Sequence, residues 1–115
     1  MTVPVDIAVL ESFVGPERDV VDEVLQDFLE SATRMGRDLV ETSAKPDVLG
    51  AAAVAHKLKS SASSVGALKL AELCALIESA GSSGDLATCT AFMPQFEAEL
   101  TAVCRYLRAA RRLST

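Results

Sequence analysis

Residues 51–66 read Ala-Ala-Ala-Val-Ala-His-Lys-Leu-Lys-Ser-Ser-Ala-Ser-Ser-Val-Gly, and their periodicity indicates an α-helix. Apolar side chains recur at steps of three and four residues, which places them on one helical face. That face, the candidate core side, holds Ala51, Val54, Ala55, Leu58, Ala62 and Val65. No segment of the chain shows the period-two alternation of a half-buried strand, so the sequence predicts an all-α protein.

The other side of this helix carries His56, the single histidine of the chain. Residues three, four and seven apart share a face, so His56 lies with small or cationic neighbours. These neighbours are Ala52, Ala53, Lys59, Ser60 and Ser63. We expect a smooth strip around the ring, which the backbone and loops of another protein can approach closely.

Breakers at Gly15-Pro16, Lys45-Pro46-Asp47, Gly66 and 81–84 divide the rest of the chain into helical pieces. One long helix is predicted from Glu17 to about Ser43, and the helix that Asp47 caps runs to about Val65. A third helix covers Ala67 to Ala80, with Gly81 as its C′ residue.

Asp85 is expected to cap a last, long helix with a heptad-like apolar seam. The seam consists of Leu86, Cys89, Met93, Phe96, Leu100, Val103 and Leu107. Pro94 should kink this helix or divide it. A shorter segment, Val5 to Val14, is expected to lie across one end. The short connections predict an antiparallel up-and-down four-helix bundle with a short additional N-terminal helix.

Composition narrows the functions open to the chain. Its 115 residues fit one domain, spanning 1–115, and the net charge of −5 argues against nucleic-acid or anionic-membrane binding. With one histidine and three scattered cysteines, a multi-histidine metal site or a zinc ribbon is excluded. The cysteines are expected in the core, in a cytoplasmic protein without a signal peptide. Carboxylates at Asp19, Asp22, Glu23, Asp27 and Glu30 are expected to be solvated.

The surroundings of His56 suit phosphoryl chemistry. A neutral imidazole is nucleophilic near physiological pH, since its ordinary pKa is about 6.5. Lys59, one turn along the helix, is placed to offset the charge of a phosphoryl group on the ring. Lys57 points about 100° around the helix and is expected to guide docking instead. The alternative is that His56 and the lysines are ordinary solvated side chains.

Residues 55–67, Ala-His-Lys-Leu-Lys-Ser-Ser-Ala-Ser-Ser-Val-Gly-Ala, resemble the signature of histidine-containing phosphotransfer (HPt) domains. The resemblance continues through 70–74 and 77–78 to Gly81 and Gly84-Asp85, and it covers essentially the whole chain. It implies a four-helix bundle that accepts a phosphoryl group from one receiver-domain aspartate and passes it to another receiver.

The resemblance implies that His56 is the phosphoacceptor and that Lys59 is the family's lysine three residues on. Ser60 stands where the family commonly has glycine, and Ser63 matches a small position of the docking face. Glu78 matches a polar position of the following helix. In a hairpin that turns near Gly66, His56 and Glu78 are roughly level, so we expect Glu78 to accept a hydrogen bond from the ring. An exposed carboxylate without that role is the alternative.

Two rival functions are compatible with this sequence. One is a non-catalytic adaptor that binds and inhibits a histidine kinase or receiver domain; the other is a bundle that dimerises through its apolar seam. The favoured hypothesis is a stand-alone monomeric phosphocarrier whose partners are receiver domains of response regulators and hybrid histidine kinases. No ATP-binding glycine motif is present, and no cofactor or metal is expected in this chain. Mg²⁺ is expected in the partner receiver domain.

Overall fold

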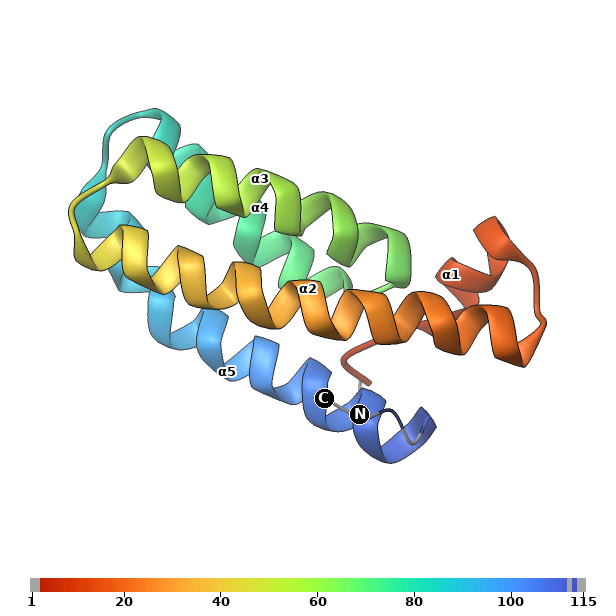
Figure 1. The fold of residues 1–115 in the computed structure, drawn as a ribbon. Coiled ribbons are helices and arrows are strands. Elements are labelled where there is room, and N and C mark those ends of the chain that lie inside the picture. Colours follow the sequence, from red (N-terminus) through yellow and green to blue (C-terminus); the bar gives the residue numbers. More distant parts are fainter. Residues whose placement is uncertain (1–2, 112, 114–115) are drawn as a thin grey trace.

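Five helices follow one another in the computed structural model, which describes residues 3–111 and 113 (Figure 1). They are α1 (Ile7–Val14), α2 (Arg18–Ala44), α3 (Val48–Val65), α4 (Leu68–Ser82) and α5 (Leu86–Arg111). Helices α2 to α5 form an antiparallel bundle in which each packs on the next and α5 closes against α2. The predicted all-α bundle with an extra N-terminal helix is confirmed.

Aspartate side chains begin three of the helices. Asp47 accepts a hydrogen bond from the backbone N–H of Gly50 at 2.9 Å, and Asp85 accepts one from Thr88 at 3.1 Å. Both caps were predicted. Asp6 caps α1 in the same way through the N–H of Ala8, at 3.2 Å. Each cap satisfies a backbone donor that the first turn of a helix leaves without a partner.

The core runs along the whole bundle. Most of the α5 seam is buried, at Cys89, Met93, Phe96, Val103 and Leu107, whereas Leu86 and Leu100 stay partly exposed. All three cysteines are buried free thiols, as expected. Helix α3 contributes mainly small side chains to the core, at Ala51, Ala55 and Ala62, so its neighbours can approach its backbone closely.

One expectation about a helix end was wrong. Gly81 is not the C′ residue of α4, because the helix continues to Ser82 and Gly81 is buried inside it. A Cβ at Gly81 would lie 2.6 Å from the carbonyl oxygen of Val48, so this glycine permits α3 and α4 to touch. Helix α5 runs through Pro94 without a break, so the structure excludes a division there, one of the two outcomes expected; buried Met93 and Phe96 hold the helix to the bundle on both sides of the proline.

Gly66 joins the α3–α4 turn to the N-terminal segment. It has a left-handed φ of 88°, and its carbonyl oxygen accepts a hydrogen bond from the N–H of Asp6 at 2.9 Å. A Cβ at this position would collide with the Asp6 carbonyl. The crossing places α1 at the end of the bundle where α3 turns into α4 (Figure 1).

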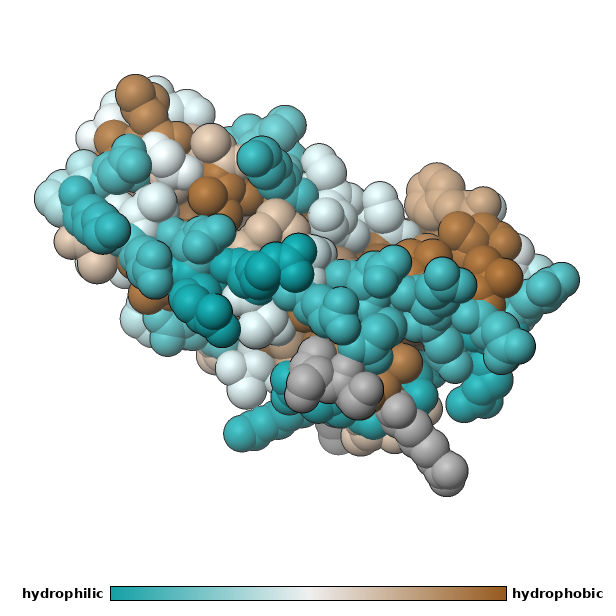
Figure 2. All heavy atoms as spheres, viewed as in Figure 1, coloured by the Kyte–Doolittle hydropathy of each residue, from teal (hydrophilic) through white to brown (hydrophobic). Residues whose placement is uncertain are grey.

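Polar side chains cover α2, and apolar ones gather over α1 (Figure 2). Asp22 departs from the expected solvated row, because it accepts a hydrogen bond from Nε of Arg111 at 2.7 Å and is largely screened from solvent. This ion pair ties the first turns of α2 to the last turn of α5. Every helix of the described residues is too short or too polar to span a bilayer.

We expect Gly81→Ala to destabilise the bundle although alanine is the better helix former. The added methyl group must push α3 away from α4, and overpacking of this kind costs about 1–3 kcal/mol. Urea unfolding of the variant and of the exposed control Ser79→Ala measures the effect. A Gly81→Ala protein as stable as the control would show that α3 and α4 can separate at no cost.

Candidate functional site

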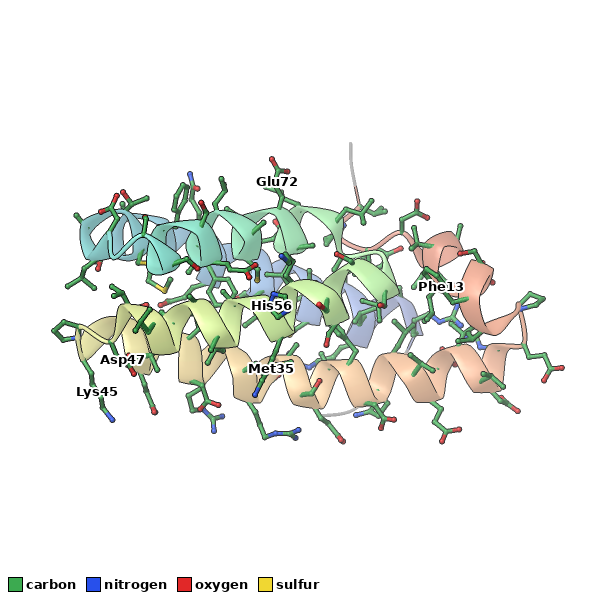
Figure 3. The ribbon with its side chains drawn as sticks, turned by 90° about the horizontal axis from the view of Figure 1, so that it is seen from above. Phe13, Met35, Lys45, Asp47, His56 and Glu72 are labelled. Carbon is green, nitrogen blue, oxygen red and sulfur yellow. The ribbon has the colours of Figure 1, made fainter. Side chains whose placement is uncertain are left out.

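The α3–α4 hairpin brings together three side chains that the sequence singled out. His56 and Lys59 lie on α3, and Glu78 lies on α4, 22 residues after His56. Antiparallel packing on either side of the Gly66 turn makes them level, as the count of residues predicted. Figure 3 shows His56 on the α4 side of α3.

One carboxylate holds both basic groups. Oε2 of Glu78 lies 2.8 Å from Nδ1 of His56, and Oε1 lies 2.6 Å from Nζ of Lys59. The side chain of His56 is 61% exposed, whereas those of Lys59 and Glu78 are 33% and 25% exposed. The arrangement fixes the ring through one nitrogen and leaves its outer part open to solvent.

The charge state of Glu78 determines which way the bond to the ring runs. The hydrogen bond from Lys59, together with a weaker one from His56, lowers the pKa of Glu78 below its ordinary value against an opposing effect of desolvation. Glu78 is therefore ionised at neutral pH, and an ionised carboxylate can only accept hydrogen bonds. Nδ1 of His56 must be the donor, so in the neutral ring Nε2 carries the free lone pair.

A thiol lies close to this group without sharing its reactivity. Burial raises the pKa of Cys74 to about 12, with a further upward effect of Glu78 and a downward effect of Lys59. The thiolate is the nucleophilic form of cysteine, and it is scarce at neutral pH when the pKa is so high. His56 is thus the available nucleophile of the site.

Most of the predicted strip around His56 is open. Ala53, Lys57, Ser60 and Ser63 are exposed on α3, and the Ser60 hydroxyl donates to the His56 carbonyl oxygen. Ala52 was misplaced: it is 8% exposed and packs against Gly81, because its position leans toward α4. It cannot form part of an open surface.

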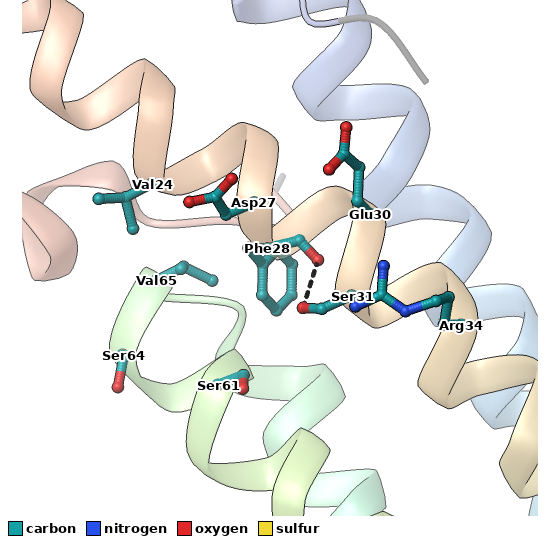
Figure 4. A pocket seen from close by; sticks show the side chains of 9 residues that line it. All are labelled: Val24, Asp27, Phe28, Glu30, Ser31, Arg34, Ser61, Ser64 and Val65. Atoms are coloured by element: carbon teal, nitrogen blue, oxygen red, sulfur yellow. Dashed lines mark hydrogen bonds between the residues drawn. The ribbon is translucent and has the colours of Figure 1, made fainter.

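Two features next to the strip were missed. Leu49 is 72% exposed and lies seven residues before His56, on the same face of α3, a spacing that the sequence already contained. A groove between α2 and α3 is lined by Val24, Asp27, Phe28, Glu30, Ser31, Arg34, Ser61, Ser64 and Val65 (Figure 4). No sequence signal marks the groove, since it depends on how the two helices pack.

Metal ligands do not gather in the part of the chain that the structure describes. No group of three or more histidine, cysteine, aspartate or glutamate side chains there is placed to hold an ion. The candidate site therefore consists of an imidazole, a carboxylate and an ammonium group.

Comparison with known proteins agrees with this geometry. The family model of the Hpt domain matches residues 20–106, and the chain belongs to that family. Its fold is similar to the crystal structure of histidine-containing phosphotransfer protein B (HptB) from Pseudomonas aeruginosa PAO1. The two share 26% sequence identity with a TM-score of 0.86, over 95% of each chain. Among proteins with curated descriptions, none matches this sequence.

The hydrogen bond to Glu78 predicts one tautomer of the neutral ring. We expect ¹⁵N spectra of the neutral His56 ring to show a protonated Nδ1 and an unprotonated Nε2. Glu78→Ala should restore the tautomer mixture of a free imidazole. The control Glu72→Ala changes an exposed glutamate of α4 that points away from His56 (Figure 3), so its spectrum should match the wild type. A protonated Nε2 in the wild type would contradict the geometry.

A second expectation concerns the pH dependence of stability. Because folding lowers the pKa of Glu78 below its ordinary value of 4.5, its contribution is fully present above that pH and is lost as the pH falls through the lower, folded-state pKa. The difference in free energy of unfolding between wild type and Glu78→Gln should shrink below pH 4.5. Urea unfolding across a pH series measures it, with Glu72→Gln as control. A difference that grows as the pH falls below 4.5 would have the wrong sign.

Proposed function

We propose that this chain is a phosphocarrier that takes a phosphoryl group onto Nε2 of His56 from a receiver-domain aspartate and passes it to a second receiver. The observation that carries the proposal is the bond between Nδ1 of His56 and Glu78 at 2.8 Å, beside a ring that is 61% exposed. It holds the imidazole still and directs its nucleophilic nitrogen toward solvent, where a partner arrives.

The transfer balances without any further reactant. The Nε2 lone pair attacks phosphorus, a P–N bond forms, and the P–O bond to the aspartate breaks to release a carboxylate. The ring keeps its Nδ1 proton and becomes cationic, and Glu78 accepts the hydrogen bond of that proton. A carboxylate aimed at a charge that grows during transfer is a form of electrostatic stabilisation. Return of the phosphoryl group to an aspartate reverses the same steps.

Lys59 is proposed to offset the charge of the bound phosphoryl group. An ammonium group has three donors, so one can stay on Oε1 of Glu78 while another meets a phosphoryl oxygen. The position one turn from His56 supports this role, and the bond to Glu78 restricts the motion of a side chain that is otherwise flexible. Glu78 therefore positions the ring and the ammonium group together.

The rest of the site is assigned to the partner. Ala53, Lys57, Ser60 and Ser63 are proposed as docking residues, because they are exposed around the ring. Mg²⁺ is proposed to belong to the receiver's aspartate pocket, where the leaving carboxylate forms. We further propose that 1–115 is a single domain that works as a monomer in the cytoplasm, where its three thiols stay reduced.

Transfer of label from receiver domains tests the function. Each receiver domain of the source cell's response regulators and hybrid kinases is phosphorylated on its aspartate with labelled phosphate and mixed with the chain. We expect at least one to transfer an acid-labile, base-stable label, in a ratio approaching one per chain. His56→Gln should lose at least about 99% of it, because glutamine has no nucleophilic ring nitrogen. The control Glu72→Gln changes an exposed residue outside the site, so this variant should accept label as the wild type does.

Two outcomes would overturn the proposal. If His56→Gln accepts label as well as the wild type does, the phosphoacceptor is a different residue. The second outcome is that no receiver labels the wild type, while the chain inhibits a kinase or a receiver. If the His56→Ala variant inhibits equally well, the chain is an adaptor that carries no phosphate.

A further inference from the structure

The exposed face of α3 includes a row of five residues with one large apolar member. Leu49, Ala53, His56, Ser60 and Ser63 follow one another at steps of three and four, so they lie along the outer side of the helix. Leu49 is the one large hydrophobic side chain of α3 that is exposed, at 72%. Core packing does not explain its presence, since the inner face of α3 is filled by other residues.

A receiver domain that exchanges phosphate with His56 must come to rest on this row, because its aspartate has to reach the ring. A stable interface buries about 800 Å² of each partner, which corresponds to a circular footprint about 16 Å in radius. Seven helical residues span about 10 Å, so a footprint centred on His56 includes Leu49. Small side chains lie between the two and leave no obstacle to a flat approach.

We propose that Leu49 anchors the receiver domain that exchanges phosphate with His56, by contacting an apolar group about 10 Å from the receiver's aspartate. The inference rests on the proposed function and adds a residue that determines affinity. Leu49 would lie about 10 Å from the centre of that footprint, inside its edge, where an apolar side chain can be closed off from water and contribute more than rim contacts do. The polar surroundings of His56 supply orientation and chemistry, whereas Leu49 supplies the hydrophobic contact that the site itself lacks.

The chain offers a matched control in Leu76. It is an exposed leucine on α4, at 43%, and it lies two residues from Glu78. Residues two apart on a helix point about 200° from each other, so Leu76 faces away from His56 if Glu78 faces toward it. Leu49→Ala thus removes an apolar side chain inside the proposed contact area around His56, and Leu76→Ala removes the same side chain from a position that faces away from His56.

The experiment measures transfer from the labelled receiver domain to wild type, Leu49→Ala and Leu76→Ala over a range of chain concentrations. We expect Leu49→Ala to raise KM about tenfold, equivalent to about 1.4 kcal/mol, with little change in the maximal rate. Leu76→Ala should match the wild type. Circular dichroism and thermal unfolding verify that both variants are folded, which their exposure favours.

A small donor separates docking from chemistry. Phosphoramidate passes its phosphoryl group to Nε2 with release of ammonia and needs no protein surface, so it should label wild type and Leu49→Ala at equal rates. An unchanged KM for Leu49→Ala with the receiver would overturn the anchor while leaving the phosphocarrier intact. Slower labelling of Leu49→Ala by phosphoramidate would also overturn it, since Leu49 would then act on the ring itself. A wild type that no receiver labels rejects the proposed function instead.

Discussion

The close contact of α3 with α4 is the constraint on which the site depends. Gly81 removes the side chain that would separate the two helices, and Ala52 packs into the space. Gly66 sets the turn and so the register between them. A shift of one residue along either helix would rotate its side chains by about 100° and move Glu78 away from His56. The hydrogen bond between Nδ1 of His56 and Glu78 therefore depends on the register that the packing of α3 against α4 sets.

Much of this arrangement could be predicted from local patterns. Helix spacing identified the core faces, aspartates identified the caps of α3 and α5, and counting residues about the Gly66 turn made His56 level with Glu78. The errors arose where tertiary contact overrides local preference. Glycine is typical of a helix end, yet Gly81 lies inside α4 because α3 packs against it. The division considered at Pro94 is absent, since buried side chains hold α5 on both sides of the proline. The pairing of Asp22 with Arg111 joins residues 89 apart, and no local pattern specifies it.

Ala52, expected on the open strip but found buried, shows that residues on nearly the same helical face can differ in exposure. Ala52 and Ala53 both neighbour His56 by spacing, but they differ by about 100° around the axis. That angle separates a side chain packed beneath α4 from one open to solvent. The same geometry distinguishes Lys59, which reaches Glu78, from Lys57, which does not share that contact. Sequence spacing identifies neighbours, whereas the position of the adjacent helix decides which of them are accessible.

Burial of every cysteine makes the surface of this protein free of reactive thiols. Burial raises the pKa of Cys74, Cys89 and Cys104 above the ordinary value, so alkylating reagents meet little thiolate at neutral pH. A cysteine introduced at Ser60 would then be a unique attachment point for a fluorophore, one turn from the histidine ring. No buried cysteine has to be replaced before labelling. The fluorophore would report the binding and release of a partner over His56 in real time.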